Sequence, residues 1–568
     1  MIDSLSPALI LICGAVLIPL LKGNIRSIYA ISLPVLGLIQ LWSMEFGNYG
    51  LTSMFGFDMV MTRLDSLSFL FSNIFLLAAI LGVIFALHLR PPMELTATSI
   101  YAGAAIGAAL AGDLISLFLY WELTALASVL LIWAGNNERS FQAGMRYLFV
   151  QIGSGVLLMA GTVMLAHQQG AIAFEAMTLS DPATMLIFIA FGFKAAFPLL
   201  NNWLIDSYPE ASPTGAVVLS SFTTKLAIYA LARGFPGTEI LLPIGVVMTL
   251  VPAIYAVLEN DLRRVLAHSL NIQLGFMVVG VGIGTEMALN GAVAHAFAHV
   301  FYKALLFMTM GAVLFSTDTV KASELGGLFR KMPLVAICCI IGALSISAMP
   351  LTSGFITKSI ILSAAIETGH HQIWLGLILA SSCAMLYCGL KIPYFAFFGK
   401  DCGITPRSIP ANMNIAMVAA AAICIAIGVW PGALYNLLPH QGGEYHAFTF
   451  GHVISQLQIL AFSSLAFFFF LRRGFYPEMQ NSITLEFDWV YRRALPVISY
   501  MISTLLIVGR SYMLDNLKNW LDQVLTALYR HHGPTGVLAR TWPIGSTTMW
   551  VAILLGLYLV LYYIGGSG

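Results

Sequence analysis

Apolar segments that can cross a lipid bilayer recur along almost the whole chain. A transmembrane α-helix needs about 20 predominantly apolar residues, and sixteen candidate segments can be marked in the sequence. They cover residues 8–21, 27–44, 67–88, 98–112, 114–134, 141–166, 183–203, 213–234, 240–258, 265–284, 287–315, 333–366, 373–399, 412–432, 450–471 and 547–565. A transmembrane β-barrel would show alternating stretches of about ten residues instead. The pattern therefore predicts an all-α polytopic membrane protein with about 16 transmembrane helices.

Charged residues are too scarce for a water-soluble protein. Only 9% of the 568 residues are Asp, Glu, Lys or Arg, and 59% are hydrophobic, whereas roughly one quarter of a soluble chain is charged. The 27 cations and 26 anions nearly cancel, so the chain has no bulk field that would attract nucleic acid. We expect the lipid bilayer, and no nucleic acid, among its partners.

The few cations are sorted between the two sides of the segmented chain. Cytoplasmic loops of membrane proteins collect Lys and Arg. One side of the predicted topology holds Lys22, Arg26, Arg90, Arg139, Arg263, Arg264, Lys321, Arg330, Lys331, Lys400, Arg407, Arg472 and Arg473. The other side holds only Arg63 and Arg233. This asymmetry predicts an N-terminus that faces away from the cytoplasm.

The region 487–532 differs from the apolar segments because charges interrupt its Trp, Tyr, Leu, Ile and Val residues. It is predicted to form an amphipathic helix that lies along the membrane surface or a neighbouring helix. As one helix it would extend about 70 Å, with a start or a kink at Pro496. Residues 494–508 are almost long enough to span, so a crossing there is the alternative. Residues 547–565 form the final predicted span.

Seven charged residues lie inside predicted spans, where each costs at least about 3 kcal/mol near the bilayer centre. Glu122 lies in the middle of 114–134, and Lys194 lies four residues before Pro198. Because proline frees a backbone carbonyl inside the membrane, Lys194 marks a water-accessible ion site. Glu122 is interpreted as a proton-exchanging carboxylate, and a structural ion pair with Lys194 is the alternative.

Further titratable residues follow at membrane depth. Lys225 lies at the centre of 213–234, too far from either end for its amine to reach the surface easily. His295, His299 and Lys303 repeat every four residues and therefore line one stripe of a helix. The stripe is interpreted as a proton wire. Zinc binding by the two histidines is the alternative, but no third ligand is near.

The segment 333–366 is too long to cross the bilayer as one straight helix. Met349-Pro-Leu-Thr-Ser-Gly354 supplies a break, and Lys358 follows it. Two broken segments with a lysine beside each are typical of inverted-repeat transporters. Lys391 and Arg146 lie nearer the cytoplasmic ends, where Lys391 is a lesser candidate for an exit route.

No cofactor or metal site is expected. The seven cysteines are scattered through apolar runs, with no CxxC pair and no Cys/His spacing typical of zinc, haem or iron–sulfur sites. The segments divide the chain into N-terminal helices (1–97), a first repeat (98–234), a second repeat (240–399), C-terminal helices (412–471), an amphipathic surface helix (487–532) and a final span (547–565).

Several ordered motifs resemble the antiporter-like subunits shared by Mrp-type cation/proton antiporters, the proton-pumping arms of respiratory complex I and membrane-bound hydrogenases. The resemblance covers nearly the whole chain and is closest to the D-type component of Mrp antiporters. The motifs that carry it are Tyr120-Trp-Glu-Leu-Thr, Phe197-Pro, Trp203-Leu-Ile-Asp206-Ser-Tyr-Pro, Thr224-Lys-Leu-Ala-Ile-Tyr, Asp261-Leu-Arg-Arg, His299-Val-Phe-Tyr-Lys, Glu324-Leu-Gly-Gly-Leu, Ser353-Gly-Phe-Ile-Thr-Lys and Phe397-Phe-Gly.

The resemblance implies two inverted five-helix repeats, each with a broken helix, joined by a hydrated polar axis. Glu122 and Lys194 look like the family's ion pair, and Lys225 looks like the lysine that receives the proton. His295, His299 and Lys303 look like the central relay, and Lys358 looks like the terminal exchange site. Two departures stand out: Asn201-Asn202-Trp203 replaces the usual His-Thr-Trp, and the run that begins at Phe487 resembles the lateral-helix ending of the distal complex I subunit.

These observations favour a proton-translocating subunit of a multisubunit Na+/proton antiporter in the plasma membrane of a prokaryote, with other membrane subunits, protons and Na+ as partners. A proton-pumping subunit of a redox-driven complex, of the complex I or hydrogenase type, is the alternative. A scaffold subunit without transport is the third hypothesis. A transporter subunit is favoured over an enzyme, because no nucleophile or metal constellation is present in the sequence.

Overall fold

The computed structural model describes residues 5–54, 56–170, 172–440, 445–480, 489, 493–541 and 543–565. The chain divides into two compact units, Met1–Thr484 and Leu485–Gly568. Each unit is described by itself.

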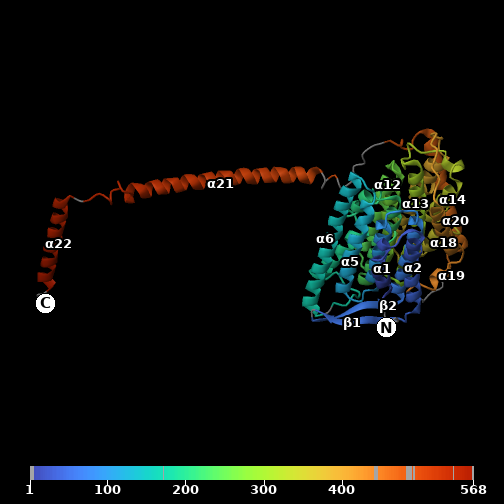
Figure 1. The fold of residues 1–568 in the computed structure, drawn as a ribbon, viewed down its shortest axis with the longest axis horizontal. Coiled ribbons are helices and arrows are strands. Elements are labelled where there is room, and N and C mark those ends of the chain that lie inside the picture. The colour runs from blue at the N-terminus through green and yellow to red at the C-terminus, as the bar shows by residue number, and fades with distance from the viewer. Residues whose placement is uncertain are drawn as a thin grey trace. The chain divides into compact units, whose positions relative to one another are not determined.

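The first unit is a bundle of helices that run side by side (Figure 1). Its helices are α1 (Pro7–Ala15), α2 (Gly23–Ser43), α3 (Ser66–Ala86), α4 (Met93–Leu110), α5 (Leu114–Trp133), α6 (Glu138–Gln169), α7 (Pro182–Ala195), α8 (Asn202–Ser207), α9 (Pro213–Leu219), α10 (Thr223–Gly234), α11 (Leu241–Leu258), α12 (Leu262–Ile283), α13 (Glu286–Thr317), α14 (Pro333–Ile346), α15 (Ser353–Glu367), α16 (His371–Ala384), α17 (Lys391–Pro393), α18 (Ala411–Val429), α19 (Gly432–Tyr435) and α20 (Phe450–Arg473). Short 3₁₀ turns occupy Ile18–Leu20 and Leu328–Arg330.

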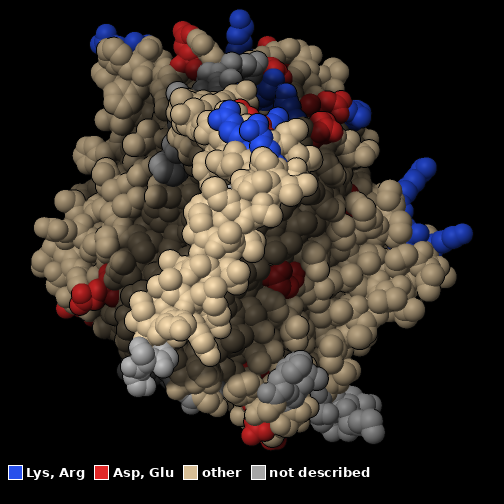
Figure 2. Space-filling view, turned by 90° about the vertical axis from the view of Figure 1, so that its left-hand side faces the viewer, with Lys and Arg blue, Asp and Glu red and all other residues tan. Residues whose placement is uncertain are grey.

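The predicted polytopic helical architecture is confirmed. Over the described residues of both units, 13 helices are long and apolar enough to cross a membrane, and three shorter apolar helices accompany them. The expected count of about 16 spans is not confirmed. Figure 2 shows a surface that is mostly uncharged.

A β-hairpin is present that the sequence did not predict. Strands β1 (Gly47–Met54) and β2 (Phe57–Leu64) pair antiparallel, with Leu51 opposite Val60. The Asp113 carboxylate and the Gly112 N–H both bond the backbone of Val60. We call the side of the bundle that carries the hairpin and α19 the outer face (Figure 1), and the side that carries most Lys and Arg loops the inner face.

Helix α13 forms the centre of the first unit. It packs against α12, α14, α15, α9 and α18, and almost all of its side chains are buried. A Cβ placed on Gly291 would come within 3.0 Å of Ile360 and Ile361, so glycine is what permits α13 and α15 to approach so closely. This packing holds the predicted stripe of α13 inside protein rather than against lipid.

One helix in each repeat begins in the same way, with an aspartate cap and a backbone bridge next to it. Asp113 caps α5 and forms a backbone bridge with Ala173. Asp261 caps α12 and forms an equivalent bridge with Lys321. The first pair lies at the outer face and the second at the inner face of the predicted topology. The inversion expected of the repeats is therefore visible in their helix starts.

Both expected helix breaks are present, and they share one backbone conformation. Helices α7 and α8 are separated by residues 196–201, which include Ala196-Phe-Pro-Leu199, and α14 and α15 by a stretch that includes Ala348-Met-Pro-Leu351. Ala196 and Leu199 have φ of 60° and 69°, and Ala348 and Leu351 have φ of 59° and 71°. Left-handed backbone at non-glycine residues is costly and is held only where the surroundings over-determine it.

Two irregularities occur where the sequence analysis expected unbroken segments. The segment 213–234 is interrupted between α9 and α10, at Ser220, Ser221 and Phe222. The segment 373–399 contains π-helical turns at Met385–Leu390 and Tyr394–Phe398, on either side of α17. π-Helical turns are frequent at functional sites, and those described here flank Lys391. The interruption between α9 and α10 lies beside Lys225.

In the part of the second unit that the structure describes, there are two helices. Helix α21 (Leu495–His532) extends about 57 Å and begins with Pro496 in its first turn, where proline is tolerated. It has no buried residue, and its length and hydropathy also satisfy those of a candidate span. Of the amphipathic region predicted from 487, residues 487–488 and 490–492 lie outside the described residues. Helix α22 (Ile544–Gly565) covers the predicted final span.

Candidate functional site

Four lysines are enclosed in the first unit at the depth of the helix breaks. Lys194, Lys225 and Lys303 have no exposed surface, and Lys358 is 1% exposed. Within the described residues, no Asp or Glu oxygen lies within ion-pair distance of any of these four amines. Their N–H groups donate to carbonyls and hydroxyls instead. An amine held in this way is stabilised as a cation only weakly, which suits a group that gains and loses protons.

Lys194 is held by α5 rather than by Glu122. Its Nζ donates to the Trp121 carbonyl at 2.6 Å and to Thr124 Oγ1 at 2.7 Å, and it lies 4.2 Å from the centre of the Trp121 ring. Ser154 Oγ fixes the indole by accepting from its Nε1. The structure therefore binds Lys194 to residues on both sides of Glu122 along α5, without bringing the two charges into contact.

Glu122 is turned toward α6. Its Oε1 is buried and has no hydrogen-bond partner among the described residues. A Cβ on Gly155 would lie 1.4 Å from that oxygen, so the carboxylate occupies space that only glycine leaves free. Gln151, one turn earlier on the same face of α6, is fully buried and its amide is also unpartnered. Buried polar side chains normally have a hydrogen-bond partner, so two unpartnered ones side by side indicate a functional role.

Lys225 lies one turn after the interruption between α9 and α10. Its Nζ donates to the Ser220 carbonyl at 2.5 Å and to Thr224 Oγ1 at 3.3 Å. The interruption frees the Ser220 carbonyl from the helix, and the lysine satisfies it. The amine is thus placed at a helix break, as the other lysines beside breaks are.

The stripe on α13 connects with α12 and α15. His295 shares a hydrogen bond with Thr357 Oγ1 at 2.9 Å and another with Gln273 Oε1 at 3.2 Å. The His295 and His299 rings stack with centres 6.1 Å apart. Both nitrogens of His299 are buried without a partner among the described protein atoms. Lys303 donates to Ser269 Oγ, whose hydroxyl also lies 3.8 Å from Cys388 Sγ.

Lys358 and Lys391 bind carbonyls at helix ends. Lys358 Nζ donates to the Ile346 carbonyl of the α14 break at 2.7 Å and lies 4.9 Å from the centre of the Phe276 ring. Lys391 Nζ donates to three carbonyls at the end of α11: Ala256 at 3.0 Å, Val257 at 2.7 Å and Glu259 at 2.5 Å. All three donors of Lys391 are occupied, so its geometry suits a cationic cap of α11 better than a proton carrier.

Sequence reasoning missed the uncharged members of this site. Gln151, Gln273, Asn271, Tyr302 and Tyr387 are all buried between the charged residues, and Tyr302 and Tyr387 lie within 3.4 Å of Gln273. They could have been found as polar side chains in the middle of apolar segments. Within the described residues, no group of three His, Cys, Asp or Glu side chains could hold a metal ion.

A cavity of about 780 Å³ opens at the outer face of the second repeat. The described residues of its lining include Glu286, Asn290, Ile360, Glu367 and His440, and no lysine or arginine is among them. Asn290 and His440 bond each other through the Asn290 side chain and the His440 backbone. Asn290 precedes His295 by five residues on α13, about 7.5 Å of rise. The cavity therefore reaches to within two helical turns of the buried site.

This chain is similar in sequence to a known family and to several known proteins. Residues 111–384 match the family described as NADH:quinone oxidoreductase/Mrp antiporter, transmembrane. "Hydrogenase-4 component B" of Escherichia coli (strain K12) is 28% identical over 457 residues, which are 70% of this chain and 66% of that protein. "Putative antiporter subunit mnhD2" of Staphylococcus aureus (strain JH9) is 27% identical over 353 residues, 58% of this chain and 70% of that protein.

A solved structure of the Mrp complex from Dietzia sp. DQ12-45-1b contains a chain with the same fold. The TM-score is 0.68 at 21% identity, and the match covers 82% of this chain and 98% of that chain. At this identity the likeness concerns the fold. The chain carries, over residues 111–384, the transmembrane domain of the NADH:quinone oxidoreductase/Mrp antiporter family.

Proposed function

We propose that this chain is a proton-translocating subunit of a multisubunit monovalent cation/proton antiporter in a prokaryotic cell membrane. The observation that carries the proposal is the line of buried amines across both repeats, none of which lies within ion-pair distance of a carboxylate among the described residues. Charged side chains inside transmembrane segments are rare, and they mark ion and proton pathways. Amines that are bound only by carbonyls and hydroxyls can exchange protons without breaking an ion pair.

In this proposal, the first repeat (98–234) and the second repeat (240–399) each form a half-channel. Protons pass between Glu122 and Lys194, then through Lys225 to the stripe of His299, His295 and Lys303, and Lys358 exchanges them at the far end. Because neighbouring amines repel each other when both are charged, protonation at one site lowers proton affinity at the next. Lys391 is assigned a secondary role on the exit side, since its amine is already bound by three carbonyls.

Na+ is the cation that we propose to be exchanged, with other membrane subunits completing the transporter. The relative from Staphylococcus aureus carries the name of an antiporter subunit, and the structural neighbour belongs to an Mrp complex. The alternative is a proton-pumping subunit of a redox-driven complex. It is favoured by the hydrogenase-4 component, whose match extends over 70% of this chain.

The test measures proton movement in inside-out membrane vesicles that contain the assembled complex. A Na+ pulse should dissipate a preformed pH gradient in vesicles with the unmodified chain. Lys225→Ala should reduce that rate by on the order of 100-fold, the size of a typical proton-transfer contribution. Lys400→Ala removes an exposed lysine of the inner face and serves as the matched control.

Three outcomes separate the hypotheses. Cation-driven proton movement that is lost in Lys225→Ala supports the antiporter. Proton movement that requires an added electron donor and ignores Na+ supports the redox-driven alternative. Unchanged proton movement in Lys225→Ala and Glu122→Ala, with the complex assembled, leaves only a scaffold role.

A further inference from the structure

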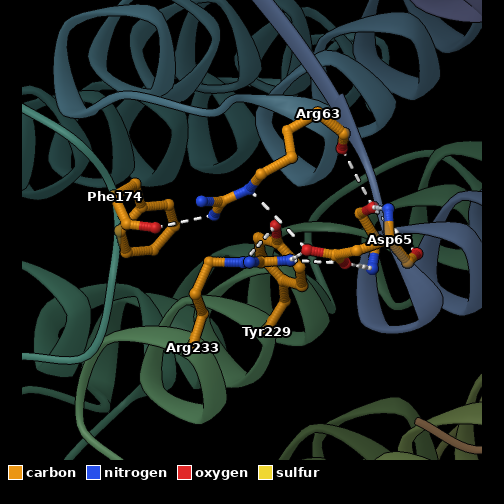
Figure 3. A network of polar contacts seen from close by, with 6 residues as sticks. Arg63, Asp65, Phe174, Tyr229 and Arg233 are labelled. Atoms are coloured by element: carbon orange, nitrogen blue, oxygen red, sulfur yellow. Dashed lines mark hydrogen bonds and ion pairs between the residues drawn. The ribbon is translucent and has the colours of Figure 1, made fainter. Parts of the chain in front are cut away.

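The two cations that depart from the inner-face distribution of Lys and Arg meet at one carboxylate. Arg63 lies on β2 and Arg233 lies in the last turn of α10, 170 residues later in the chain. Arg233 Nη2 donates to both oxygens of Asp65 at 2.7 Å, and Arg63 Nε lies 3.7 Å from Asp65 Oδ2 (Figure 3). We call Arg63, Asp65 and Arg233 the outer cluster. Their meeting at one site calls for a reason, because arginines on this face oppose the general sorting of charge.

The outer cluster is tied to the surrounding elements on every side. Arg63 Nη2 donates to the Phe174 carbonyl at 2.6 Å, which joins the hairpin to the loop before α7. Asp65 also caps α3 by accepting from the Ser68 N–H at 2.9 Å. Burial opposes ionisation of the Asp65 carboxyl, but the Arg233 charge and the Ser68 N–H together lower its pKa below the ordinary value. The carboxylate therefore stays ionised, and the cluster carries two positive charges and one negative.

A polar stripe links the outer cluster to the proton site. Lys225, Tyr229 and Arg233 follow each other at intervals of four on α10 and so share one face of the helix, over about 12 Å. Tyr229 is fully buried, and its hydroxyl accepts from Arg233 Nε at 2.8 Å. The rings of Phe71 and Phe174 pack against the Tyr229 ring, with their centres 5.3 and 6.3 Å from its centre. Without Arg233, this stripe would lead from Lys225 through Tyr229 toward the outer face.

An arginine within such a connection blocks the transfer of protons along it. A guanidinium does not release its proton in proteins, so it cannot relay one. Arg63 and Arg233 have side chains only 18% and 11% exposed, and in such surroundings a net positive charge repels hydronium and metal cations strongly. Among the described residues, the other carboxylate that acts on Arg63 belongs to Glu175, which is exposed and exerts the weakest influence. A positive arginine at a constriction is a known physical means of keeping cations and protons out.

We propose that the outer cluster is a charge barrier that prevents protons and cations of the outer side from reaching Lys225 through the first repeat. The barrier deepens the proposed function and rests on it, because a transporter must not let protons bypass its coupled route. By contrast, the described residues that line the cavity beside Glu286 and Glu367 include no lysine or arginine. Access from the outer side is thereby left to the second repeat.

The test is a passive leak measured in right-side-out vesicles that contain the assembled complex, without Na+ and with the membrane potential clamped. After an acid pulse outside, Arg233→Gln should raise the rate of internal acidification several-fold. Arg233→Lys keeps the positive charge and should stay near the unmodified rate. Arg407→Gln removes an arginine of a different ion pair, the exposed one with Asp318, and should change nothing.

Asp65→Asn separates a charge barrier from a structural latch. Asparagine is as good a helix cap as aspartate, and the variant leaves both arginines without their negative partner. A charge barrier predicts no increase in leak, whereas a latch predicts that Asp65→Asn leaks as much as Arg233→Gln. Equal leaks in the two variants would therefore overturn the proposal.

The route is tested by the double variant Arg233→Gln, Lys225→Ala. Its leak should return to the unmodified rate, and a leak that persists would place the path elsewhere. If Arg233→Gln fails to assemble, Arg63→Gln replaces it, and the absence of leak in assembled Arg63→Gln counts against the barrier. Loss of Na+-driven proton movement in the unmodified complex would contradict the proposed function alone, since the leak is measured without Na+.

Discussion

The position of Glu122 depends on the absence of a side chain at Gly155. Its carboxylate lies directly over Gly155, where a Cβ would come within 1.4 Å of Oε1. The side chain is flexible, so a methyl group there displaces the carboxylate rather than the helix. Gly155 thus decides where Glu122 stands relative to Lys194, although glycine itself has no chemistry to contribute.

We expect Gly155→Ala to lower proton transport by about tenfold or more, because displacing a reacting group by about 1 Å can cost on the order of 100-fold. Assembly should be preserved, since only the tip of Glu122 has to move. Gly153→Ala on the same helix is the control, because nothing lies within 4 Å of its added Cβ. Proton flux in vesicles and the amount of assembled complex are the two measurements. Equal fluxes in the two variants would show that the position of Glu122 is not critical.

At this scale the sequence predicted charges better than contacts. The cost of a buried charge singles out Lys194, Lys225, Lys303 and Lys358, and all four are buried; their roles stay predictions. The expected pairing of Glu122 with Lys194 is not formed, because backbone and hydroxyl acceptors on α5 hold the amine. Which acceptor a lysine reaches depends on rotamers and packing, and no periodicity in the sequence encodes these.

The positions of the helix breaks could be predicted from the sequence, but their backbone conformation could not. The sequence predicts them from Pro198 and Pro350, because proline removes a backbone donor inside a span. It does not predict that Ala196 and Ala348 adopt left-handed backbone, nor that both breaks share the pattern Ala-x-Pro-Leu. The hairpin and the π-helical turns were missed for a related reason: tertiary contacts determine them, and hydropathy carries no signal for them.

Two neighbouring alanines can test how much the left-handed backbone of the break between α7 and α8 reduces the stability of the protein. Ala195 ends α7 with ordinary helical backbone, whereas Ala196 has φ of 60°, and both are fully buried. Ala195→Gly should destabilise the protein by about 1 kcal/mol through lost helix propensity. Ala196→Gly should be neutral or stabilising, because left-handed backbone costs a non-glycine residue about 1–2 kcal/mol.

The measurement is the apparent melting temperature of the purified protein in detergent. Each variant removes the same buried methyl group, so the cavity left behind is a matched contribution. Ala196→Gly should melt at or above the unmodified temperature, and Ala195→Gly below it. The reverse order would mean that the left-handed conformation at Ala196 is not strained.

On the scale of the whole molecule, the uneven distribution of Lys and Arg predicts which face of the first unit is cytoplasmic. The loops that hold most Lys and Arg define the inner face, and the hairpin and the outer cluster lie opposite. The N-terminal and central helices could be placed in this frame from the sequence because a single missed span would have mixed the two sets of loops. The orientation of α21 could not, since its length suits both a surface helix and a span.

Labelling with a membrane-impermeant maleimide tests that frame. Cys402 is exposed in the loop after residue 399, which is predicted to be cytoplasmic, so it should react in inside-out vesicles and be protected in right-side-out vesicles. Thr52→Cys, in the exposed part of β1 and combined with Cys402→Ser, should show the opposite pattern. Reaction of both positions from the same side would refute the predicted topology. If the two labelling patterns were exchanged, the topology in the membrane would be the reverse of the predicted one. The outer cluster would then keep cytoplasmic protons from Lys225, and Arg233→Gln would leak protons from the cytoplasmic side.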